Sequence, residues 1–326
     1  MILVTGGAGY IGSHFVLKML EKGEEVIVFD NLELGHIEII DKLKKYGKLK
    51  FIKGDLKILD DIRGVFLSNK DISSVVHFAA YSQVAESVKH PQKYYYNNVY
   101  GTLNLLNAML EFGVKKIIFS STAATYGNPK YTPIDENHLQ NPINPYGNTK
   151  LMIEKIMDDY DKAYGLKSVR LRYFNVAGAD SESRIGEWHV PETHLIPNIL
   201  KADKNKSFKM FGTDYETNDG TCIRDYINIE DLVQAHIKAL EYLNKQEITN
   251  YFNIGTNGGN SVKEVFNICE QIKGEKIPIE IQQRREGDPA VLVADNTKAK
   301  QILNWIPEHD LNYSIKTAYK WENIIK

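Results

Sequence analysis

The chain has 326 residues, 43% hydrophobic and 25% charged, and a formal net charge of −2, which argues against a nucleic-acid-binding or membrane-surface protein. No apolar run approaches the ~18–20 residues of a membrane span, and the start of the chain lacks the basic region and cleavage site of a signal peptide. The two cysteines, Cys222 and Cys269, are isolated, which predicts a reduced cytoplasmic protein without a disulfide framework or a metal site.

In the first half of the chain, short β-rich runs alternate with amphipathic segments. The β-rich runs cover residues 2–6, 25–30, 49–55, 74–80, 116–121 and 168–175. The amphipathic segments cover residues 12–22, 57–68, 91–112 and 146–164. Strands alternating with helices predict a parallel, doubly wound α/β sheet of the Rossmann type. The runs are nearly continuously apolar, as expected for strands covered on both faces.

The alternation ends near residue 176, and the second half indicates a smaller, mixed α/β lobe. Beyond residue 176 the expected elements are helices near 195–204, from about 229 and near 261–272, strands at 251–255 and 277–281, and two C-terminal helices, with 221–255 returning to the large lobe. We therefore predict a Rossmann domain formed by residues 1–175 plus about 221–255. The second lobe is predicted from about 176–220 plus 256–326.

A glycine-rich turn follows the first predicted strand and opens a helix. Gly6, Gly9 and Gly12 form the pattern G-x-x-G-x-x-G, which allows a tight turn, close approach of a pyrophosphate to the backbone and close helix packing. Asp30 ends the second strand, where a carboxylate accepts hydrogen bonds from an adenosine ribose and favours NAD over NADP. Asp55, after the third strand, is a candidate for the adenine amino group, and its position also suits a helix N-cap.

A Tyr-x-x-x-Lys pattern would place both side chains on one face of a helix. It occurs at Tyr46–Lys50, Tyr126–Lys130 and Tyr146–Lys150. The first copy contains a glycine and runs into a strand, and the second encloses the turn sequence GNP. Only the third opens a helical stretch, because Pro145 suits a first helical turn. It also lies downstream of a strand that ends in small hydroxyl residues, including Thr122, and such a trio is suited to hydride chemistry at an alcohol.

The physical argument for this trio is acid–base matching. A free tyrosine has a pKa of ~10, too high for a base at neutral pH. One positive charge ~4 Å away, at an effective dielectric of ~20, is worth about 4 kcal/mol, or roughly three pKa units. We therefore expect Lys150, together with a positively charged nicotinamide ring, to bring the pKa of Tyr146 close to neutrality.

Seven motifs together make the chain resemble the extended short-chain dehydrogenases, and within them the UDP-glucose 4-epimerase family. They are GGAGYIGSH, NNVYGTLNLL, FSSTAATYG, PYGNTK, RYFNVAGA, FGTDYETNDGTCIRDYI and RREGDPAVLVAD. The resemblance covers essentially the whole chain. It implies that Tyr146 removes the proton of the sugar 4-hydroxyl, that hydride passes from C4 to NAD, and that the 4-keto sugar turns over while tethered by UDP. The implied activity is the interconversion of UDP-glucose and UDP-galactose, in galactose metabolism.

The resemblance also implies which residues form the site. The implied catalytic residues are Tyr146, Lys150 and Thr122. The implied cofactor-binding residues are Gly6, Gly9, Tyr10, Ile11, Gly12, Asp30, Asn31, Asp55, Leu56, Phe78, Ala79, Ala80, Asn97, Ser120, Tyr146, Lys150 and Tyr173. The implied substrate-binding residues are Thr122, Tyr146, Asn175, His194, Leu195, Phe211, Arg224, Arg285, Asp288 and Leu292. No metal is implied.

Departures and alternatives follow from the same motifs. Ser82 stands where members of the family carry a cofactor-binding lysine, and His194 stands where an asparagine is usual. A bulky Leu292 favours UDP-glucose and UDP-galactose over N-acetylated UDP-sugars. The alternative functions are a UDP-GlcNAc, UDP-glucuronate or UDP-xylose 4-epimerase and a non-catalytic NAD sensor. A 4,6-dehydratase would need an acid pair where this chain has Ala123 and Ala124. Members of the family are commonly homodimers, here through helices near 91–112 and 146–164.

Overall fold

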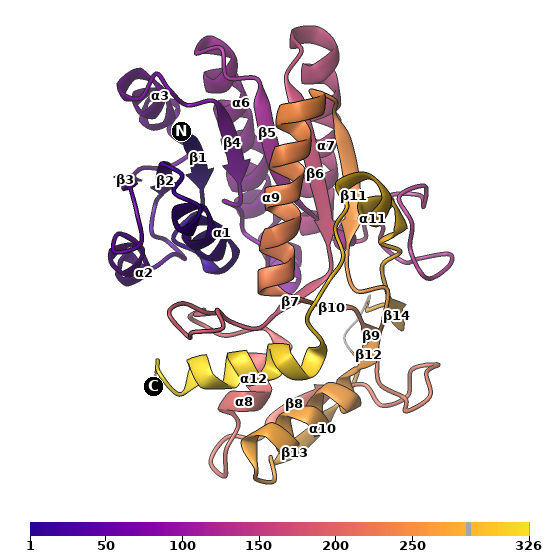
Figure 1. Cartoon of the computed structure of the whole chain (residues 1–326). Coiled ribbons are helices and arrows are strands. Elements are labelled where there is room, and N and C mark those ends of the chain that lie inside the picture. Colours follow the sequence, from indigo (N-terminus) through magenta and orange to yellow (C-terminus); the bar gives the residue numbers. More distant parts are fainter. Residues whose placement is uncertain (285–287, 326) are drawn as a thin grey trace. The chain divides into compact units, whose positions relative to one another are not determined.

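A computed structural model describes residues 1–284 and 288–325 of the chain (Figure 1). The chain divides into two compact units, each made of three separate stretches. Unit 1 comprises residues 1–127, 139–172 and 235–252. Unit 2 comprises residues 128–138, 173–234 and 253–326. Residues 221–234 group with unit 2, because their strands pair with other strands of that unit.

A seven-stranded sheet forms the centre of unit 1, with the order β11-β6-β5-β4-β1-β2-β3. Its strands are β1 (Ile2–Thr5), β2 (Val26–Asp30), β3 (Leu49–Lys53), β4 (Ser74–His77), β5 (Lys116–Thr122), β6 (Lys167–Tyr173) and β11 (Asn250–Ile254). β1 pairs in parallel with both β2 and β4, so the strand order reverses between β1 and β4. This confirms the predicted doubly wound sheet, in which ligands bind at the carboxyl ends of the strands beside such a reversal.

The helices that accompany this sheet follow the predicted alternation, with three additions. They are α1 (Tyr10–Glu21), α2 (Ile37–Leu43), α3 (Leu59–Ser68), α4 (Val84–Lys89), α5 (Pro91–Tyr94), the π-helix η1 (Tyr95–Tyr100), α6 (Gly101–Glu111), the 3₁₀ turn η2 (Ala123–Thr125), α7 (Pro145–Tyr164) and α9 (Ile229–Gln246). The sequence pattern did not indicate α2, α4 or the π-helical turn within 91–112. None of the described helices combines the length and the hydropathy that a membrane span needs.

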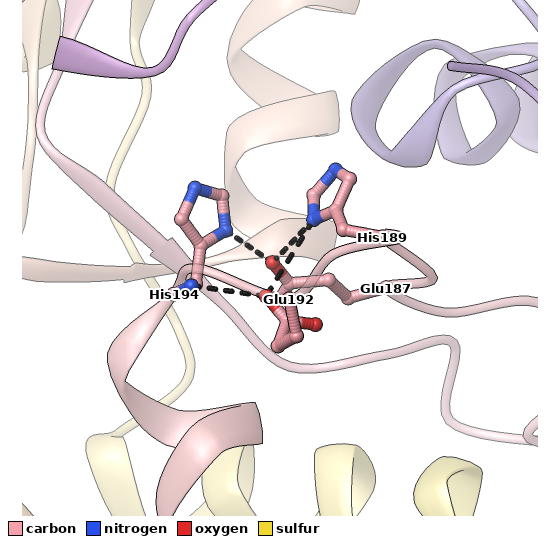
Figure 2. Close-up of side chains that lie close together, drawn as sticks. All are labelled: Glu187, His189, Glu192 and His194. Atoms are coloured by element: carbon pink, nitrogen blue, oxygen red, sulfur yellow. Dashed lines mark hydrogen bonds and ion pairs between the residues drawn. The ribbon is translucent and has the colours of Figure 1, made fainter. Parts of the chain in front are cut away.

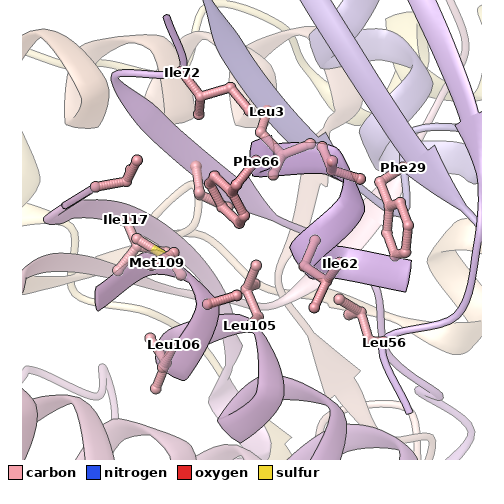
Figure 3. Packing of buried hydrophobic residues seen from close by; sticks show 14 of the residues in the cluster. Leu3, Phe29, Leu56, Ile62, Phe66, Ile72, Leu105, Leu106, Met109 and Ile117 are labelled. Carbon is pink, nitrogen blue, oxygen red and sulfur yellow. The ribbon is translucent and has the colours of Figure 1, made fainter. Parts of the chain in front are cut away.

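Helices cover both faces of the sheet. On one face, Leu3, Phe29 and Ile117 of the strands pack against side chains of α3, α6 and α7 (Figure 3). On the other face lie α1 and α9 (Figure 1), where Phe15 and His236 pack around Phe78. Burial on both faces explains why the strand sequences are continuously apolar rather than alternating.

Unit 2 is the mixed α/β part that the sequence predicts. Its strands are β7 (Asn175–Ala177), β8 (Phe208–Phe211), β9 (Ile223–Arg224), β10 (Tyr226–Asn228), β12 (Asn260–Ser261), β13 (Ile279–Gln282) and β14 (Val291–Leu292). Its helices are α8 (Leu195–Lys201), α10 (Val262–Lys273), α11 (Thr297–Leu303) and α12 (Leu311–Glu322). β8 pairs in parallel with β13, and β7 in parallel with β10. Ile199, Val265, Cys269 and Ile315 form its apolar centre.

Candidate functional site

The glycine turn between β1 and α1 is required by the packing of unit 1 at two of its three positions. Gly6 has a φ of +73°, and a Cβ there would lie 2.6 Å from the backbone nitrogen of Ala79. A Cβ on Gly12 would lie 2.2 Å from the carbonyl oxygen of Gly6. These two positions therefore fix the tight turn and the close packing of helix on strand.

Gly9 is different, because the protein itself leaves room for a side chain there. The nearest atom to an added Cβ is the Gly6 carbonyl oxygen, at 3.4 Å. Gly9 is also the N-cap of α1 and provides no side-chain cap for the amides of the first turn. A bare helix N-terminus with an open approach is suited to an anion such as a pyrophosphate. The turn therefore fits the diphosphate of a dinucleotide.

Two carboxylates lie beyond this turn, at the ends of β2 and β3. Asp30 is buried and accepts hydrogen bonds from the amides of Ala8 (3.0 Å) and Leu32 (2.9 Å). Burial raises the pKa of Asp30, although these two bonds oppose the shift. Asp55 accepts a hydrogen bond from the Asn31 amide group (3.1 Å). It is not the N-cap of α3, because that helix begins at Leu59 and its N-cap is the residue before it.

The remaining predicted cofactor residues of unit 1 lie at the ends of strands or in helix openings, with one exception. Phe78, Ala79 and Ala80 follow β4, Asn97 lies in η1, Ser120 lies in β5, and Tyr10 and Ile11 open α1. Leu56 is the exception, since its side chain belongs to the apolar core under α3 and α6. Tyr173 ends β6 and groups with unit 2.

The helix that carries the Tyr–Lys pair begins as the sequence predicts. Asn144 is the N-cap of α7, and its side-chain oxygen accepts a hydrogen bond from the Gly147 amide (2.8 Å), while Pro145 is the first helical residue. Tyr146 is 8% exposed and packs in an aromatic cluster with Tyr81 and Tyr94. The start of α7 is therefore fixed both by capping and by packing.

Lys150 lies one turn further along α7 and is 3% exposed. Its Nζ donates a hydrogen bond to the carbonyl oxygen of Ser120 (2.7 Å). The same nitrogen lies 4.8 Å from the centroid of the Phe119 ring and 6.0 Å from that of the Tyr146 ring. Its ammonium group is thus directed along the end of β5.

Burial dominates the acid–base properties of this pair. It raises the pKa of Tyr146 to about 12, and a hydrogen bond with Thr122 only partly offsets this. Burial also lowers the pKa of Lys150 to about 7, although the charge of Glu154 opposes the shift. Among the protein's own groups the pKa of Tyr146 is therefore raised rather than lowered, and Lys150 loses its proton at a lower pH than Tyr146 does. The prediction that Lys150 and a nicotinamide ring together lower the pKa of Tyr146 stays a prediction.

A buried ion pair supports this helix, and the sequence analysis did not identify it. Arg172 of β6 binds both carboxylate oxygens of Glu154 on α7, at 2.6–3.2 Å. The hydroxyl of Tyr126 accepts a further hydrogen bond from Arg172 (3.0 Å), and the hydroxyl of Ser121 donates to Glu154 (2.5 Å). Glu154 stands one turn after Lys150, so the pair links the lysine's helix to the neighbouring strands.

Replacing Arg172 by Met is expected to destabilise the protein by about 3–5 kcal/mol, because it leaves the buried Glu154 carboxylate without its counter-ion. Urea unfolding measures this change. Arg63→Met is the matched control, since Arg63 pairs with Glu111 at the surface and such pairs are worth about 0–1 kcal/mol. Equal losses in the two variants would contradict the structural role of the buried pair.

Unit 2 brings together three of the predicted substrate residues, two of them on the neighbouring strands β9 and β14. Arg224 of β9 is 8% exposed, pairs with Asp288 at 3.4 Å, and is the register partner of Leu292 on β14. Asn175 of β7 has an exposed side chain, and its amide bonds the carbonyl oxygen of Asp225 (3.0 Å). Phe211 ends β8 and Leu195 opens α8. Arg285 lies outside the described residues.

His194 is the N-cap residue of α8, and its imidazole binds a buried carboxylate. Its Nδ1 contacts Oε1 of Glu187, which also lies 3.1 Å from Nδ1 of His189. Burial disfavours the charged form of both histidines, but the neighbouring carboxylates of Glu187 and Glu192 have the larger combined effect. These carboxylates raise the pKa of His189 to about 9 and also raise the pKa of His194. The carboxylates thus favour the charged form of His194, which is the form that suits a ligand of phosphate.

Comparison with known proteins gives consistent similarities. The family model of GDP-mannose 4,6 dehydratase matches residues 3–318. The UDP-glucose 4-epimerase of Halalkalibacterium halodurans is 51% identical over 98% of this chain and 95% of its own length. The UDP-glucose 4-epimerase of Rhizobium leguminosarum bv. trifolii is 48% identical over 98% of this chain and 96% of its own length. The solved UDP-glucose 4-epimerase from Bifidobacterium longum, in complex with NAD+ and UDP, is 36% identical with a TM-score of 0.93, over 99% of this chain and 98% of that one.

Proposed function

This chain belongs to the UDP-glucose 4-epimerase family of extended short-chain dehydrogenases, and we propose that it interconverts UDP-glucose and UDP-galactose. The observation that carries the proposal is the arrangement of Thr122, Tyr146 and Lys150 at the end of β5 and the start of α7. A full-length identity near one half with enzymes of that name supports it.

The cofactor is NAD, which supplies a reversible two-electron oxidation at the fourth carbon of the sugar when it is bound. We assign its diphosphate to the turn at Gly9 and the α1 amides, and its adenosine ribose to Asp30. The Lys150 ammonium is positioned for the nicotinamide ribose, because Ser120 occupies only one of its three donor hydrogens.

Tyr146 acts as the base and acid at the sugar 4-oxygen. Its hydroxyl already has a hydrogen bond with Thr122, so the two groups bind one oxygen atom together. Tyr146 takes the proton as the 4-keto sugar forms and returns it when the alcohol is restored on the other face. The cost of ionising a buried phenol explains why a cation must share this environment.

The residues of unit 2 are proposed to bind the UDP end. Arg224 is the principal cation for the diphosphate, because its guanidinium is buried among strands and has one exposed carboxylate partner, Asp288. Asp288 is proposed for the uridine ribose, with Asn175 and His194 as further diphosphate ligands. Firm binding of UDP allows the hexose to turn without leaving the enzyme.

Arg224→Ala is expected to raise the KM for UDP-galactose about ten- to hundredfold with a smaller change in kcat, since charge-assisted hydrogen bonds are worth about 1.5–3 kcal/mol. Steady-state kinetics measure the split. Arg184→Ala serves as the control, because Arg184 pairs with Asp180 and is not among the proposed ligands. A lower kcat at unchanged KM would exclude Arg224 as a substrate ligand.

The residues after β5 argue against a dehydratase, despite the name of the matching family model. η2 consists of Ala123, Ala124 and Thr125, none of which can protonate a leaving hydroxyl. Leu292 lies beside Arg224 in the register of β14 and β9, and we propose that its bulk disfavours N-acetyl sugars.

We further propose a cytoplasmic homodimer that functions in galactose metabolism. Both cysteines are buried thiols that form no disulfide, as in reducing compartments. The segments proposed for the dimer contact carry exposed large side chains: Tyr96 and Tyr100, whose rings stack at 5.0 Å, and Met152 of α7. Exposed apolar groups on adjacent helices are typical of a protein interface.

The test is to incubate the purified protein with UDP-galactose, UDP-GlcNAc, UDP-glucuronate and UDP-xylose, without any added hydride donor, and to identify the products. We expect UDP-glucose from UDP-galactose, and no net oxidation or reduction. Turnover of another UDP-sugar alone would support one of the alternative epimerases. A protein that binds NAD but converts none of them would be a sensor.

A further inference from the structure

Four metal-ligating side chains converge in the segment 187–194, which precedes α8 (Figure 2). They are Glu187, His189, Glu192 and His194, and one donor atom from each lies within 4.8 Å of all the others. Nδ1 of His194 and Nδ1 of His189 both contact Oε1 of Glu187. Nδ1 of His189 also lies 3.8 Å from Oε1 of Glu192. Among the described residues, no other group of this kind reaches three members.

The surrounding structure holds the backbone at Glu187 and the carboxylate of Glu192. Glu187 is 4% exposed, and its backbone carbonyl accepts a hydrogen bond from the Trp321 indole (2.8 Å). Oε1 of Glu192 accepts hydrogen bonds from the amides of Thr193 (2.8 Å) and His194 (2.9 Å). Its other oxygen lies 3.3 Å from Nζ of Lys201. A carboxylate that outer contacts orient, as they do that of Glu192, is typical of metal ligands.

The charge of the cluster can be balanced in two ways. Glu187 and Glu192 contribute two negative charges in close contact, which two protonated imidazoles or one divalent cation can neutralise. A cation would replace the two protons, and each imidazole would then offer a lone pair in place of a hydrogen-bond donor. The same four side chains therefore suit either an ion-pair network or a metal centre.

The geometry points to a binding site for one divalent transition-metal cation, Zn²⁺ by preference, with His189, His194, Glu187 and Glu192 as its ligands. A tetrahedral zinc ion with bonds of about 2.1 Å separates its ligand atoms by roughly 3.4 Å. The separations of His189 Nδ1 from Glu187 and from Glu192, 3.1 and 3.8 Å, lie on either side of that value. His194 Nδ1 lies closer to Glu187 than this, so a bound cation would have to move these two side chains apart. Two imidazoles among four ligands favour zinc, cobalt or nickel over the all-oxygen environments of magnesium and calcium.

A cation at this place would close the loop between residues 187 and 194 and attach it to the start of α8. None of the four ligands takes part in the chemistry at Tyr146, and only His194 is shared with the proposed diphosphate site, so metal binding can be measured apart from epimerase activity. The isolated cysteines gave no sign of it, since this donor set contains no sulfur.

Cobalt binding tests the site, because Co²⁺ in a four-coordinate zinc site has intense visible absorption. We expect the chelator-treated protein to bind one equivalent of Co²⁺ with such bands, and Zn²⁺ to abolish them by competition. His189→Gln and Glu187→Gln should each lose the bands. His309→Gln is the matched control and should keep them, because His309 also pairs with a carboxylate, 2.8 Å away on Asp231, but has no second imidazole beside it.

Thermal unfolding shows whether a variant has simply failed to fold. In the presence of chelator, His189→Gln should still unfold cooperatively, at a lower temperature than the wild type because it lacks the ion pair with Glu187. Zn²⁺ should raise the midpoint of the wild type and of His309→Gln only. If Glu187→Gln does not fold, His189→Gln decides the question. Absence of cobalt bands in the wild type, or equal bands in His189→Gln, would show that the cluster is an ion-pair network only.

Discussion

Tyr146→Phe is expected to lower kcat for UDP-galactose by about a hundred- to ten-thousandfold, the usual contribution of a positioned acid–base group. The variant removes the phenolic oxygen and its hydrogen bond with Thr122. The ring itself should remain in place, because it packs against Tyr81 and Tyr94 and phenylalanine fills nearly the same volume. NAD binding and thermal stability should therefore stay close to those of the wild type.

Initial rates, together with the NAD content of the purified protein, separate chemistry from binding. Tyr94→Phe is the matched control, since Tyr94 lies in the same aromatic cluster but its hydroxyl is hydrogen-bonded with Glu86 and with the backbone of Gln83. It should lose stability rather than rate. If both variants lost the same activity, or if Tyr146→Phe kept full activity, Tyr146 would not be the base.

Lys150→Met is expected to change the shape of the pH profile as well as its height. In the wild type, burial sets the pKa of Lys150 to about 7 and that of Tyr146 to about 12. Between these values the pair carries a single proton. The active form, with tyrosinate and ammonium, has the same proton count as the resting form, so kcat/KM should be flat in that range. Below about pH 7 a second proton binds and kcat/KM should fall.

Without Lys150, the only route to tyrosinate is loss of a proton to solvent. The rate of Lys150→Met should then rise about tenfold per pH unit through neutrality. A charge 6.0 Å from the ring is worth about 3 kcal/mol at an effective dielectric of ~20, or roughly two pKa units, so a loss of about a hundredfold is expected near pH 7. Lys155→Met, on the exposed side of the same helix, should keep the wild-type profile. A plateau that persists in Lys150→Met would refute this account.

The sequence predicted the parts of the fold that depend on strong local signals. Continuously apolar runs marked the strands of the main sheet, and Asn144 with Pro145 marked the start of α7. It did not indicate α2, whose buried Ile39, Ile40 and Leu43 span too few turns to establish a helical period. The parallel pairing of β8 with β13 was equally hidden, because it joins segments far apart in the chain.

In the candidate site, too, features set by local sequence could be predicted, and features set by tertiary packing could not. Spacing and helix phase singled out the Tyr-x-x-x-Lys pair whose two residues stand on one helix, α7. The order of their pKa values could not be inferred, since it depends on burial by Phe119 and on a carbonyl of β5. The ion pair of Arg172 and Glu154 was also invisible, because only the folded sheet brings β6 and α7 together.

The division of the chain also bears on how the protein forms during synthesis. Every residue of unit 1 has been made once the ribosome reaches residue 252. Unit 2 still lacks α12, whose Trp321 packs against Gly186. Unit 1 can thus complete its contacts while translation continues, whereas unit 2 must wait for nearly the last codon.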